Sequence, residues 1–526
     1  MTTPRPPRPP RIDLLDELSW RGLLHQCTDE TGLRAHLADP DTDPRKIYIG
    51  FDPTAPSLTI GNLVQIMNLA RVRQAGHIPV VVMGGGTGLI GDPSGKSAER
   101  MLMTYEIVQS HVRSQRPIFD AVLGTVDGPD YLVFNNADWL MKISYLDALR
   151  DIGKFFSVNM MMQKESVKAR LENREQGISY TEFSYMILQA YDFDYLSEHM
   201  GVSVQFGGSD QYGNIIAGKE LQRKRAASLW DEAIVEVQRF KPDIERVDLK
   251  ASWVDRWKSF VADVLGSIKL TQHSDSQSAW LRGDQPLGAW IRDLSPDRQR
   301  AVQKYLLASN RIVAAEECFG LTAPLVTKAD GGKFGKTESG AIWLTADRTS
   351  PYAYYQFWLN ASDADAANWI KVFTFLDRAT VESLIDRHAQ NPGARELQRT
   401  LAQEATRILH GGPAMEQAEQ AAKALFSGDI AGLDAATLQE VLADVPSSNR
   451  DRADLVGEGA DPIGVLKDAG LAASNREARE FIANGSVSVN GSKLAEGVRL
   501  TEAHLMHGSL MALRRGKKSW HLVRWS

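Results

Sequence analysis

The residues that decide the fold read Tyr48-Ile49-Gly50-Phe51-Asp52-Pro53-Thr54-Ala55-Pro56-Ser57-Leu58-Thr59-Ile60-Gly61-Asn62-Leu63. The stretch begins within an apolar, β-branched run over 46–51 and passes through two prolines into a helical pattern over 63–75. A buried strand followed by a turn and a helix is the unit from which parallel α/β sheets are built. The polar residues of the turn should therefore lie at the carboxyl end of a strand, where such sheets bind ligands.

The same alternation of short apolar runs and helical stretches continues to about residue 330. Further buried strands are predicted at 78–83, 131–135 and 202–206. A glycine-rich run, Gly84-Gly85-Gly86-Thr87-Gly88, follows the second strand and permits close backbone approach to a ligand. The pattern predicts an α/β, Rossmann-like core with its binding site at the strand ends.

The chain has 526 residues, which is too long for one ordinary core and predicts two to four domains. Its apolar fraction of 43% and charged fraction of 24% are typical of a soluble globular protein. The net charge is −6, yet residues 461–526 hold ten Lys/Arg against six Asp/Glu, a net of +4. A basic end on an acidic body is an indication of RNA binding, and chance variation among surface charges is the alternative.

Only Cys27 and Cys318 occur, and no Cys/His cluster has metal-ligand spacing. This favours a reducing compartment without disulfides or structural zinc, and we expect a cytoplasmic protein. No apolar run approaches the roughly 20 residues needed to span a bilayer, so no membrane partner is predicted. Residues 1–12, rich in Pro and Arg, are predicted to be a disordered tail; a mitochondrial presequence is disfavoured by the prolines.

A second signature lies far along the chain, at Lys333-Phe334-Gly335-Lys336-Thr337. It places two ammonium groups and a hydroxyl on a Gly-hinged backbone, which suits a triphosphate during displacement. Alone, such a loop is more often a solvated surface turn. Together with the stretch at 48–63 it resembles the two signatures of class I aminoacyl-tRNA synthetases, and the surrounding sequence resembles the bacterial-type tyrosyl-tRNA synthetases. The resemblance covers roughly residues 46–225 and 318–526.

For ATP, the resemblance implies contacts from Thr54, Asn62 and the backbone of Gly50 and Gly61. Lys333, Lys336 and Thr337 should stabilise the departing pyrophosphate together with Mg²⁺; no protein-bound metal site is predicted. Thr59 stands where the family has a histidine. A threonine hydroxyl donates one hydrogen bond and is never cationic, so the exchange should cost roughly 1–3 kcal/mol of transition-state stabilisation.

The next match is Gly91-Asp92-Pro93-Ser94-Gly95-Lys96, followed by Arg100. A plain surface turn is the alternative interpretation of its Asp-Pro-Ser-Gly core. The resemblance implies that Asp92 meets the α-ammonium of the amino acid. It also places Lys96 and Arg100 on a loop near the pyrophosphate.

Tyr185, Gln189 and Asp192 are spaced by four and three residues, so they share one face of a helix. Polar groups on one face of an apolar helix indicate a lined pocket, and a buried structural network is the alternative. The resemblance implies that Asp192 and Tyr48 contact the substrate phenol, while Tyr185 and Gln189 hold its amino group. Asp52 completes the substrate pocket, and in the run 207–214 Gln211 approaches the substrate carboxylate and Asp210 the adenylate ribose.

The remaining sequence divides by composition. We expect a catalytic domain over 13–350, with a helical insertion over 226–313 that holds five of the twelve tryptophans. The tryptophans indicate a small core of its own, and a partner or tRNA contact is the alternative. Residues 351–445 are predicted to be a helical domain of the anticodon-binding type, and 446–462, rich in Ser, Gly and Asp, a flexible linker.

Residues 463–526 are predicted to be a compact α+β unit, with a capped helix over 474–482 and a strand into a tight turn over 487–491. This part resembles the S4-type RNA-binding fold. A solvated basic end is the alternative interpretation of its charges. The candidate phosphate contacts are Arg476, Arg479, Arg514, Arg515, Lys517 and Lys518.

The resemblance implies a ligase that activates tyrosine with ATP and transfers it to tRNA(Tyr). It also implies a homodimer formed through the segment 155–162. Two other hypotheses remain: an RNA-binding paralogue that has lost activation, motivated by Thr59 and the insertion, and an enzyme for another aromatic amino acid. The Tyr48 and Asp192 pair disfavours the latter.

Overall fold

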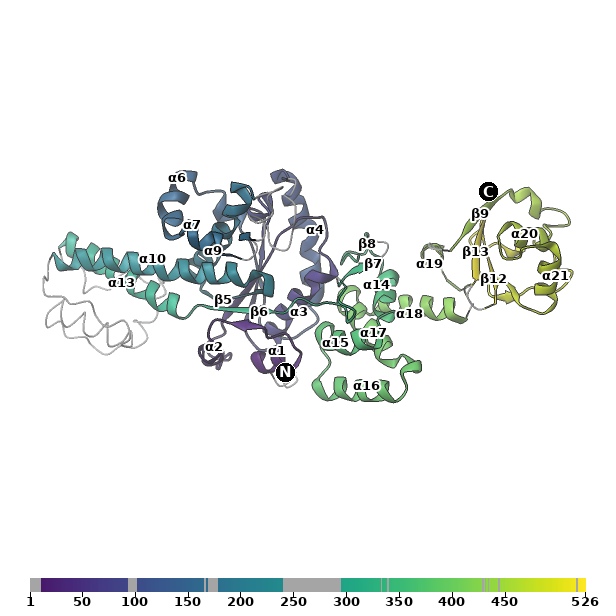
Figure 1. Cartoon of the computed structure of the whole chain (residues 1–526), viewed down its shortest axis with the longest axis horizontal. Helices are drawn as coiled ribbons and strands as arrows, with labels where there is room; N and C mark the ends of the chain where they lie inside the picture. Colours follow the sequence, from purple (N-terminus) through teal and green to yellow (C-terminus); the bar gives the residue numbers. More distant parts are fainter. Residues whose placement is uncertain are drawn as a thin grey trace, which may run out of the picture. The chain divides into compact units, whose positions relative to one another are not determined.

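The computed structural model describes residues 11–92, 102–164, 167–168, 178–239, 295–332, 334–337, 340–427, 430, 432–433, 435–442, 445–516 and 519–526. The chain divides into two compact units, Met1–Thr327 and Lys328–Ser526 (Figure 1). Among the described helices, none has both the length and the apolar character required to cross a membrane.

A six-stranded sheet forms the centre of the first unit, in the order β1-β6-β5-β2-β3-β4. Strand β1 runs antiparallel to β6, and the other neighbours are parallel. The four predicted strands are confirmed. Strands β2 and β3 have the predicted bounds, β4 begins one residue later than predicted, and β5 extends two residues further. Their bounds are β1 (Gln26–Cys27), β2 (Lys46–Phe51), β3 (Ile78–Met83), β4 (Leu132–Asn135), β5 (Val202–Gly208) and β6 (Phe319–Ala323).

The strand order contains a switch point between β2 and β5. From β2 the chain adds β3 and β4 on one side, whereas β5 and β6 lie on the other. Connections that leave in opposite directions open a crevice beyond the carboxyl ends of the two central strands. The Rossmann-like core predicted from the sequence is therefore present.

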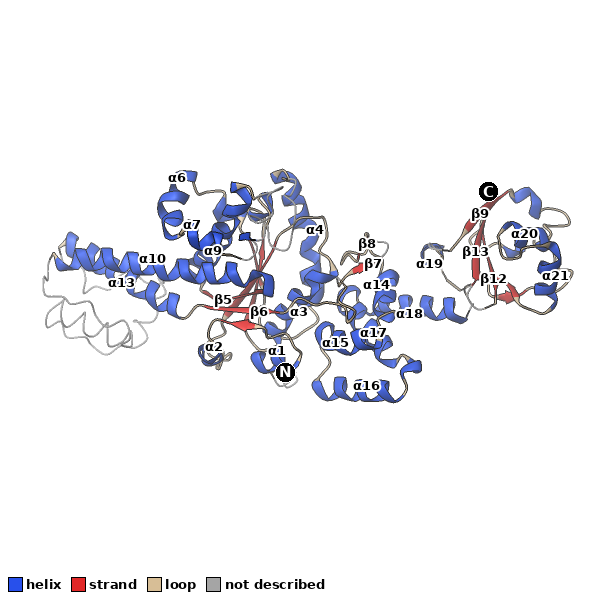
Figure 2. Ribbon diagram, in the orientation of Figure 1, coloured by secondary structure: helices blue, strands red, loops and turns tan. Residues whose placement is uncertain are grey.

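Helices surround this sheet, and Figure 2 shows the red strands of the first unit flanked by blue helices. Helix α3 begins three residues before its predicted start, since Thr59 already occupies the N-cap position. The bounds are α1 (Leu14–Trp20), α2 (Glu30–His36), α3 (Ile60–Gln74), α4 (Tyr105–Leu123), α5 (Ala137–Leu140), α6 (Tyr145–Asp147), α7 (Val158–Met162), α9 (Tyr180–Met200), α10 (Tyr212–Gln238) and α13 (Pro296–Glu316).

The second unit opens with a two-stranded hairpin and continues as helices. The hairpin pairs Lys336 with Ala341 and Thr337 with Gly340. Its elements are β7 (Lys336–Thr337), β8 (Gly340–Ala341), α14 (Pro351–Leu359), α15 (Asp363–Phe373), α16 (Arg378–Gln390), α17 (Glu396–His410), α18 (Gly412–Ser427) and α19 (Ala435–Val441).

A five-stranded sheet in the order β11-β10-β12-β13-β9 ends the chain. Along β12, Met511 and Leu513 pack into one core with α20 and α21, while Leu510 and Ala512 pack into another with α19. This alternation follows from the two-residue period of a strand. The bounds are β9 (Ser447–Arg450), α20 (Pro462–Asp468), α21 (Asn475–Ala483), β10 (Val487–Val489), β11 (Ser492–Lys493), β12 (Leu510–Arg515) and β13 (Ser519–Trp525).

Three predicted boundaries need correction. The supposed linker 446–462 is wrong, because β9 pairs in parallel with β13 and Leu455 is buried in the core of the terminal module. The supposed catalytic segment 328–350 groups with the second unit, since its loop packs on α15. Residues 1–10 of the predicted tail lie outside the described part, but Arg11 forms an ion pair with Asp41.

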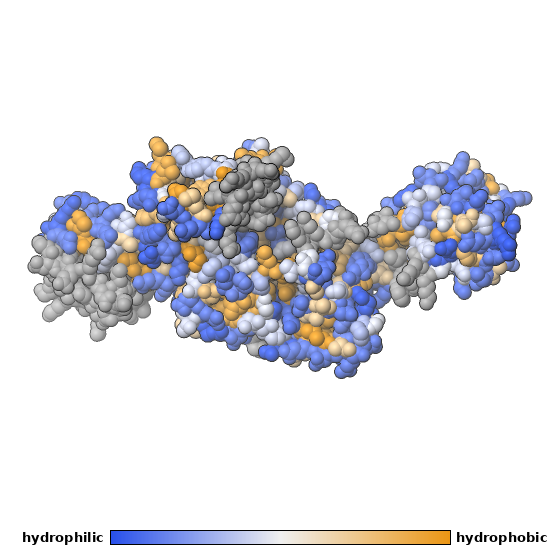
Figure 3. Space-filling view, in the orientation of Figure 1, coloured by the Kyte–Doolittle hydropathy of each residue, from blue (hydrophilic) through white to orange (hydrophobic). Residues whose placement is uncertain are grey.

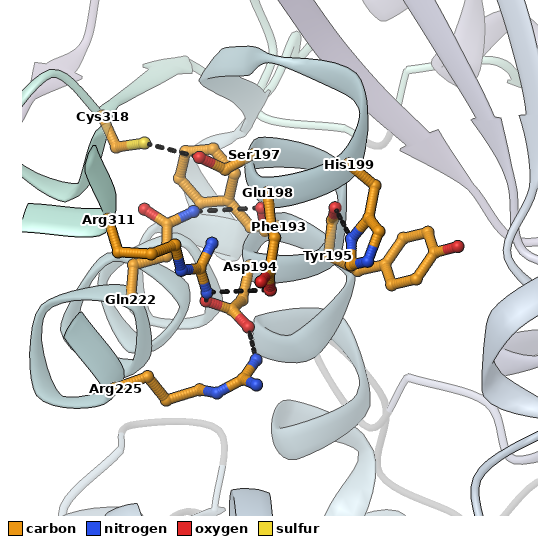
Figure 4. Close-up of polar contacts among 10 residues, drawn as sticks. All are labelled: Phe193, Asp194, Tyr195, Ser197, Glu198, His199, Gln222, Arg225, Arg311 and Cys318. Carbon is orange, nitrogen blue, oxygen red and sulfur yellow. Dashed lines mark hydrogen bonds and ion pairs between the residues drawn. The ribbon is translucent and has the colours of Figure 1, made fainter. Parts of the chain in front are cut away.

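A buried ion network joins α9 to α10 and α13 (Figure 4). Asp194 of α9 is fully buried and accepts hydrogen bonds from Arg225 of α10 and, at 2.8 Å, from Arg311 of α13. Arg311 also pairs with Glu198, one turn further along α9, at 3.1 Å. A buried carboxylate is tolerated only when it is paired and hydrogen-bonded, so these contacts determine how the three helices pack.

Replacing Asp194 with Asn should destabilise the first unit by about 3–5 kcal/mol, because it leaves two guanidinium groups without their buried partner. Urea denaturation followed by circular dichroism measures the change. Glu198→Gln is the matched control on the same network, and its more exposed pair should contribute no more than about 1 kcal/mol. Equal shifts for the two variants would contradict this account of the network.

Candidate active site

A cavity of about 320 Å³ opens at the carboxyl ends of β2 and β5. It lies within the first unit, at the switch point of the sheet. Most of the predicted substrate and ATP residues line it: Tyr48, Gly50, Asp52, Thr54, Gly61, Asn62, Asp92, Tyr185, Gln189, Asp192, Asp210 and Gln211. Segments as distant in sequence as 48–62 and 205–215 thus meet around one space.

One wall of the cavity is built around Asp52, which follows β2. Its carboxylate accepts hydrogen bonds from the Tyr185 hydroxyl at 2.8 Å and the Thr87 hydroxyl at 2.7 Å. A Cβ atom on Gly84 would lie 2.1 Å from the Asp52 carboxylate. The glycine at 84 is therefore required by a protein side chain, whereas the sequence suggested close approach to a ligand.

At the other end of the cavity, Asp192 is buried, with 4% of its surface exposed. Its two carboxylate oxygens accept hydrogen bonds from Asn136 Nδ2 at 2.8 Å and Trp139 Nε1 at 2.7 Å. Burial raises the pKa of Asp192 to about 7, and the two donors act in the opposite direction. The two neutral donors thus partly offset the cost of burying the Asp192 carboxylate. No basic side chain is among the groups that shift its pKa.

Asn136 and Trp139 were not predicted as site residues. Their position in the sequence could have indicated a role at the site, because both closely follow β4 and therefore lie at the carboxyl edge of the sheet. Nothing in the sequence pairs them with Asp192, which lies 56 and 53 residues further along the chain.

Next to Asp192, the Tyr48 hydroxyl is buried without a hydrogen-bond partner among the described residues. Burial raises the pKa of Tyr48 well above its ordinary value, and the Asp192 charge adds to this shift. The Gln189 carbonyl oxygen is also buried and unpaired within the described part of the chain. Buried polar atoms normally have partners, so these two lining atoms indicate a polar ligand in this end of the cavity.

Gln211 connects the cavity to helix α10. Its Nε2 donates to Asp92 at 2.7 Å and to Asp210 at 3.1 Å, and its Oε1 accepts from Asn214 at 3.0 Å. These contacts assign which end of the amide faces the two carboxylates. Gln211 and Asp92 therefore form one polar surface.

The first signature places the N-terminus of α3 at the cavity. Gly61 and Asn62 line the space, while Thr59 stands at the N-cap. Both the backbone N–H and the hydroxyl of Thr59 donate to Asn62 Oδ1 at 3.0 Å. Thr59 thus orients Asn62, and the helix N-terminus supplies a partial positive charge suited to phosphate.

Of the other residues predicted to contact phosphate at the active site, the structure describes the backbone of Lys336 and Thr337. Lys336 and Thr337 form β7 in the second unit. Lys333, Lys96, Arg100, Lys517 and Lys518 fall outside the described residues.

The terminal module holds the remaining predicted contacts. Arg476 and Arg479 are exposed on α21. Arg515 is partly committed to the fold, because it donates to the Leu471 carbonyl at 2.9 Å and lies over the Phe481 ring. Arg514 lies over the Trp520 ring. Among the described residues, no group of three or more His, Cys, Asp or Glu side chains has the arrangement of a metal site.

Comparison with known proteins assigns this architecture. The family model for class I tRNA synthetases of the tryptophan and tyrosine type matches residues 40–240 and 297–427. The model for the SYY-like C-terminal domain of tyrosine–tRNA ligases matches 437–523. The chain belongs to the tyrosine–tRNA ligase family. It is therefore a ligase, as the sequence predicted.

Relatives align along almost the whole chain. The tyrosine–tRNA ligase of Bacillus caldotenax is 41% identical over 98% of this chain and 100% of its own length. That of Roseiflexus castenholzii is 39% identical over 97% and 99%. A solved, C-terminally truncated mitochondrial tyrosyl-tRNA synthetase of Aspergillus nidulans shares 25% identity and a TM-score of 0.55, over 79% of this chain and 95% of that one.

The family match leaves out residues 241–296, which lie within the insertion predicted over 226–313. Its flanks are described: Trp230 of α10 packs on Tyr305 of α13, with ring centroids 4.8 Å apart. The tryptophans at 253, 257, 280 and 290 lie outside the described residues.

Tyrosine binding should weaken as the pH falls through about 7, the pKa of Asp192. Above this value the carboxylate can accept a hydrogen bond from a phenol, whereas below it the group is protonated. Between pH 8 and 6 the ionised fraction of such a group falls about tenfold, so the Kd for tyrosine should rise up to about tenfold. Calorimetric titration of the purified protein measures it.

The control is Asp192→Asn, which should bind tyrosine more weakly and with no pH dependence in this range. A wild-type Kd that stays constant from pH 6 to 8 would refute the assignment of Asp192 to the phenol.

Proposed function

We propose that the cavity of the first unit activates tyrosine with ATP, forming tyrosyl-adenylate and pyrophosphate. The terminal ribose hydroxyl of tRNA(Tyr) then attacks the adenylate and releases AMP. The observation that supports this proposal is the Asp192 and Tyr48 pair, a buried acceptor beside an unpaired buried hydroxyl. Family membership supports the reaction class.

Selection of tyrosine follows from the cost of unpaired polar groups. The substrate phenol donates to Asp192 and accepts from Tyr48, whereas phenylalanine leaves both without that partner. This penalty is known for tyrosyl-tRNA synthetase itself, which discriminates against phenylalanine by a factor of about 10⁵. Tyr185 and Gln189 hold the amino group, together with Asp92, and Gln211 approaches the carboxylate.

The chemistry needs no general base, because the tyrosine carboxylate is already a nucleophile. It attacks the α-phosphorus in line, so catalysis consists of positioning and charge stabilisation. Thr54, Asn62 and the N-terminus of α3 face the phosphates, and Asp210 holds the ribose. Lys333, Lys336 and Thr337, with Lys96 and Arg100, stabilise the pyrophosphate; Mg²⁺ would accompany ATP and neutralise charge on its β- and γ-phosphates.

The partners are tRNA(Tyr) and a second copy of the chain, in a cytoplasmic setting. Arg476, Arg479 and Arg514 offer phosphate contacts on the terminal module, with Lys517 and Lys518 beside them in sequence. For the dimer, α6 and α7 expose apolar side chains, visible as orange surface over these helices in Figure 3. They are Leu146, Val158, Met160 and Met162.

Tyrosine-dependent ATP–pyrophosphate exchange on the purified protein tests the proposal. We expect exchange with tyrosine, and none above background with phenylalanine or tryptophan, because the Asp192 and Tyr48 pair requires a phenol. Lys336→Ala should slow exchange by about 10²-fold, the loss of one charged contact to the transition state. Folded protein that exchanges with none of the three amino acids would favour the RNA-binding paralogue.

A further inference from the structure

The loop of the second signature inserts an aromatic ring into a buried cluster. The Phe334 ring centroid lies 5.0 Å from that of Trp369 and 5.1 Å from that of Phe373, both on α15. Phe357 and Trp358 of α14 follow at 5.9 and 6.2 Å. We call these four partners of Phe334 the aromatic socket.

The socket belongs to the core of the helical part. Trp358 and Phe373 are fully buried and Trp369 is 3% exposed. All four centroid distances fall in the range of favourable aromatic pairs. Phe334 itself is half-buried, so a residue from the lysine-bearing loop packs its ring against this core.

A second contact joins the same loop to the same helix. The Ala329 N–H donates to Asp365 Oδ1 at 2.7 Å, close to the start of the loop. Asp365, Trp369 and Phe373 are spaced by four residues, so one stripe of α15 makes both contacts. The loop is thus attached to α15 at its base and at Phe334.

The backbone turns directly after the socket. Gly335 has a φ of 75°, a left-handed conformation that favours glycine, and its carbonyl accepts from the Ile342 N–H at 3.1 Å. Lys336 then enters β7. Two residues of chain span at most about 7 Å, so Lys336 lies within a short reach of the position at which the socket holds Phe334.

We propose that Phe334 is a positioning residue for the activation step. The aromatic socket holds the centre of the loop, so that Lys333 and Lys336 on either side reach the pyrophosphate in the transition state. Phe334 acts only through these lysines, and the inference rests on their proposed role. A reacting group displaced by about 1 Å can lose about 10²-fold in rate.

The first test compares Phe334→Ala with the wild type in single-turnover formation of tyrosyl-adenylate. We expect the rate constant to fall about 10²-fold, with the Kd for tyrosine unchanged, because the tyrosine pocket belongs to the first unit. Phe334→Leu, which retains an apolar side chain, should recover most of the rate. A rate constant for Phe334→Ala within twofold of the wild type would overturn the proposal.

A matched control separates loop positioning from loss of packing. Tyr355 is a buried aromatic residue of the same helix, α14. Tyr355→Leu should lower the melting temperature while leaving the rate constant per active site unchanged. An equal loss of rate in this variant would show that the effect is general destabilisation, and the proposal would fall.

Trp369→Leu removes part of the socket without changing the loop sequence. It should slow activation in the same way as Phe334→Ala, and the double variant should be little slower than either, since both remove one interaction. Additive losses would argue against a shared contact.

A readout that does not depend on activity is trypsin cleavage after Lys336. Cleavage should be several-fold faster in Trp369→Leu than in the wild type, because the loop has lost its attachment. Equal cleavage rates would refute the attachment. This measurement decides the inference even if the wild type shows no exchange, an outcome that would instead refute the proposed function.

Discussion

Helix α9 carries two buried carboxylates on opposite faces, and compensating them organises the first unit. Asp194 faces α10 and α13, where Arg225 and Arg311 neutralise it. Asp192 faces the cavity, where, among the described residues, the neutral donors of Asn136 and Trp139 bind it. A carboxylate paired with cations has its oxygens occupied, whereas one held by neutral donors remains available as an acceptor for a ligand.

The same contrast explains the pocket chemistry. Full pairing with a cation would lower the pKa of Asp192 and occupy its oxygens, while a purely apolar wall would leave it protonated at neutral pH. With two neutral donors, the pKa of Asp192 is about 7, so the carboxyl group titrates near neutral pH. The neighbouring Tyr48 hydroxyl, buried and unpaired within the described part of the chain, adds a second polar atom beside Asp192.

Much of the fold could be read from local patterns. Strands β2 and β3 were predicted residue for residue because apolar runs bounded by turn residues are strong signals. Strand β9 was missed, since Ser447-Ser448-Asn449-Arg450 has the composition of a loop and is a strand only because β13 pairs with it. The boundary at 327 was missed for a related reason: the contacts that attach the 328–337 segment to α15 are made by tertiary packing.

The sequence by itself determined which residues are available for the chemistry: the spacing of Tyr185, Gln189 and Asp192, the turn at 52–62 and the Lys-Phe-Gly-Lys-Thr loop. These are local properties, set by helix and turn geometry over a few residues. Only the tertiary structure decided that Asn136 and Trp139 hold Asp192, that Thr59 orients Asn62, and that Phe334 enters the aromatic socket. The contact between Thr59 and Asn62 is local but depends on side-chain orientation. The other contacts join residues far apart in the chain, and no local sequence pattern predicts which of these residues meet when they are buried.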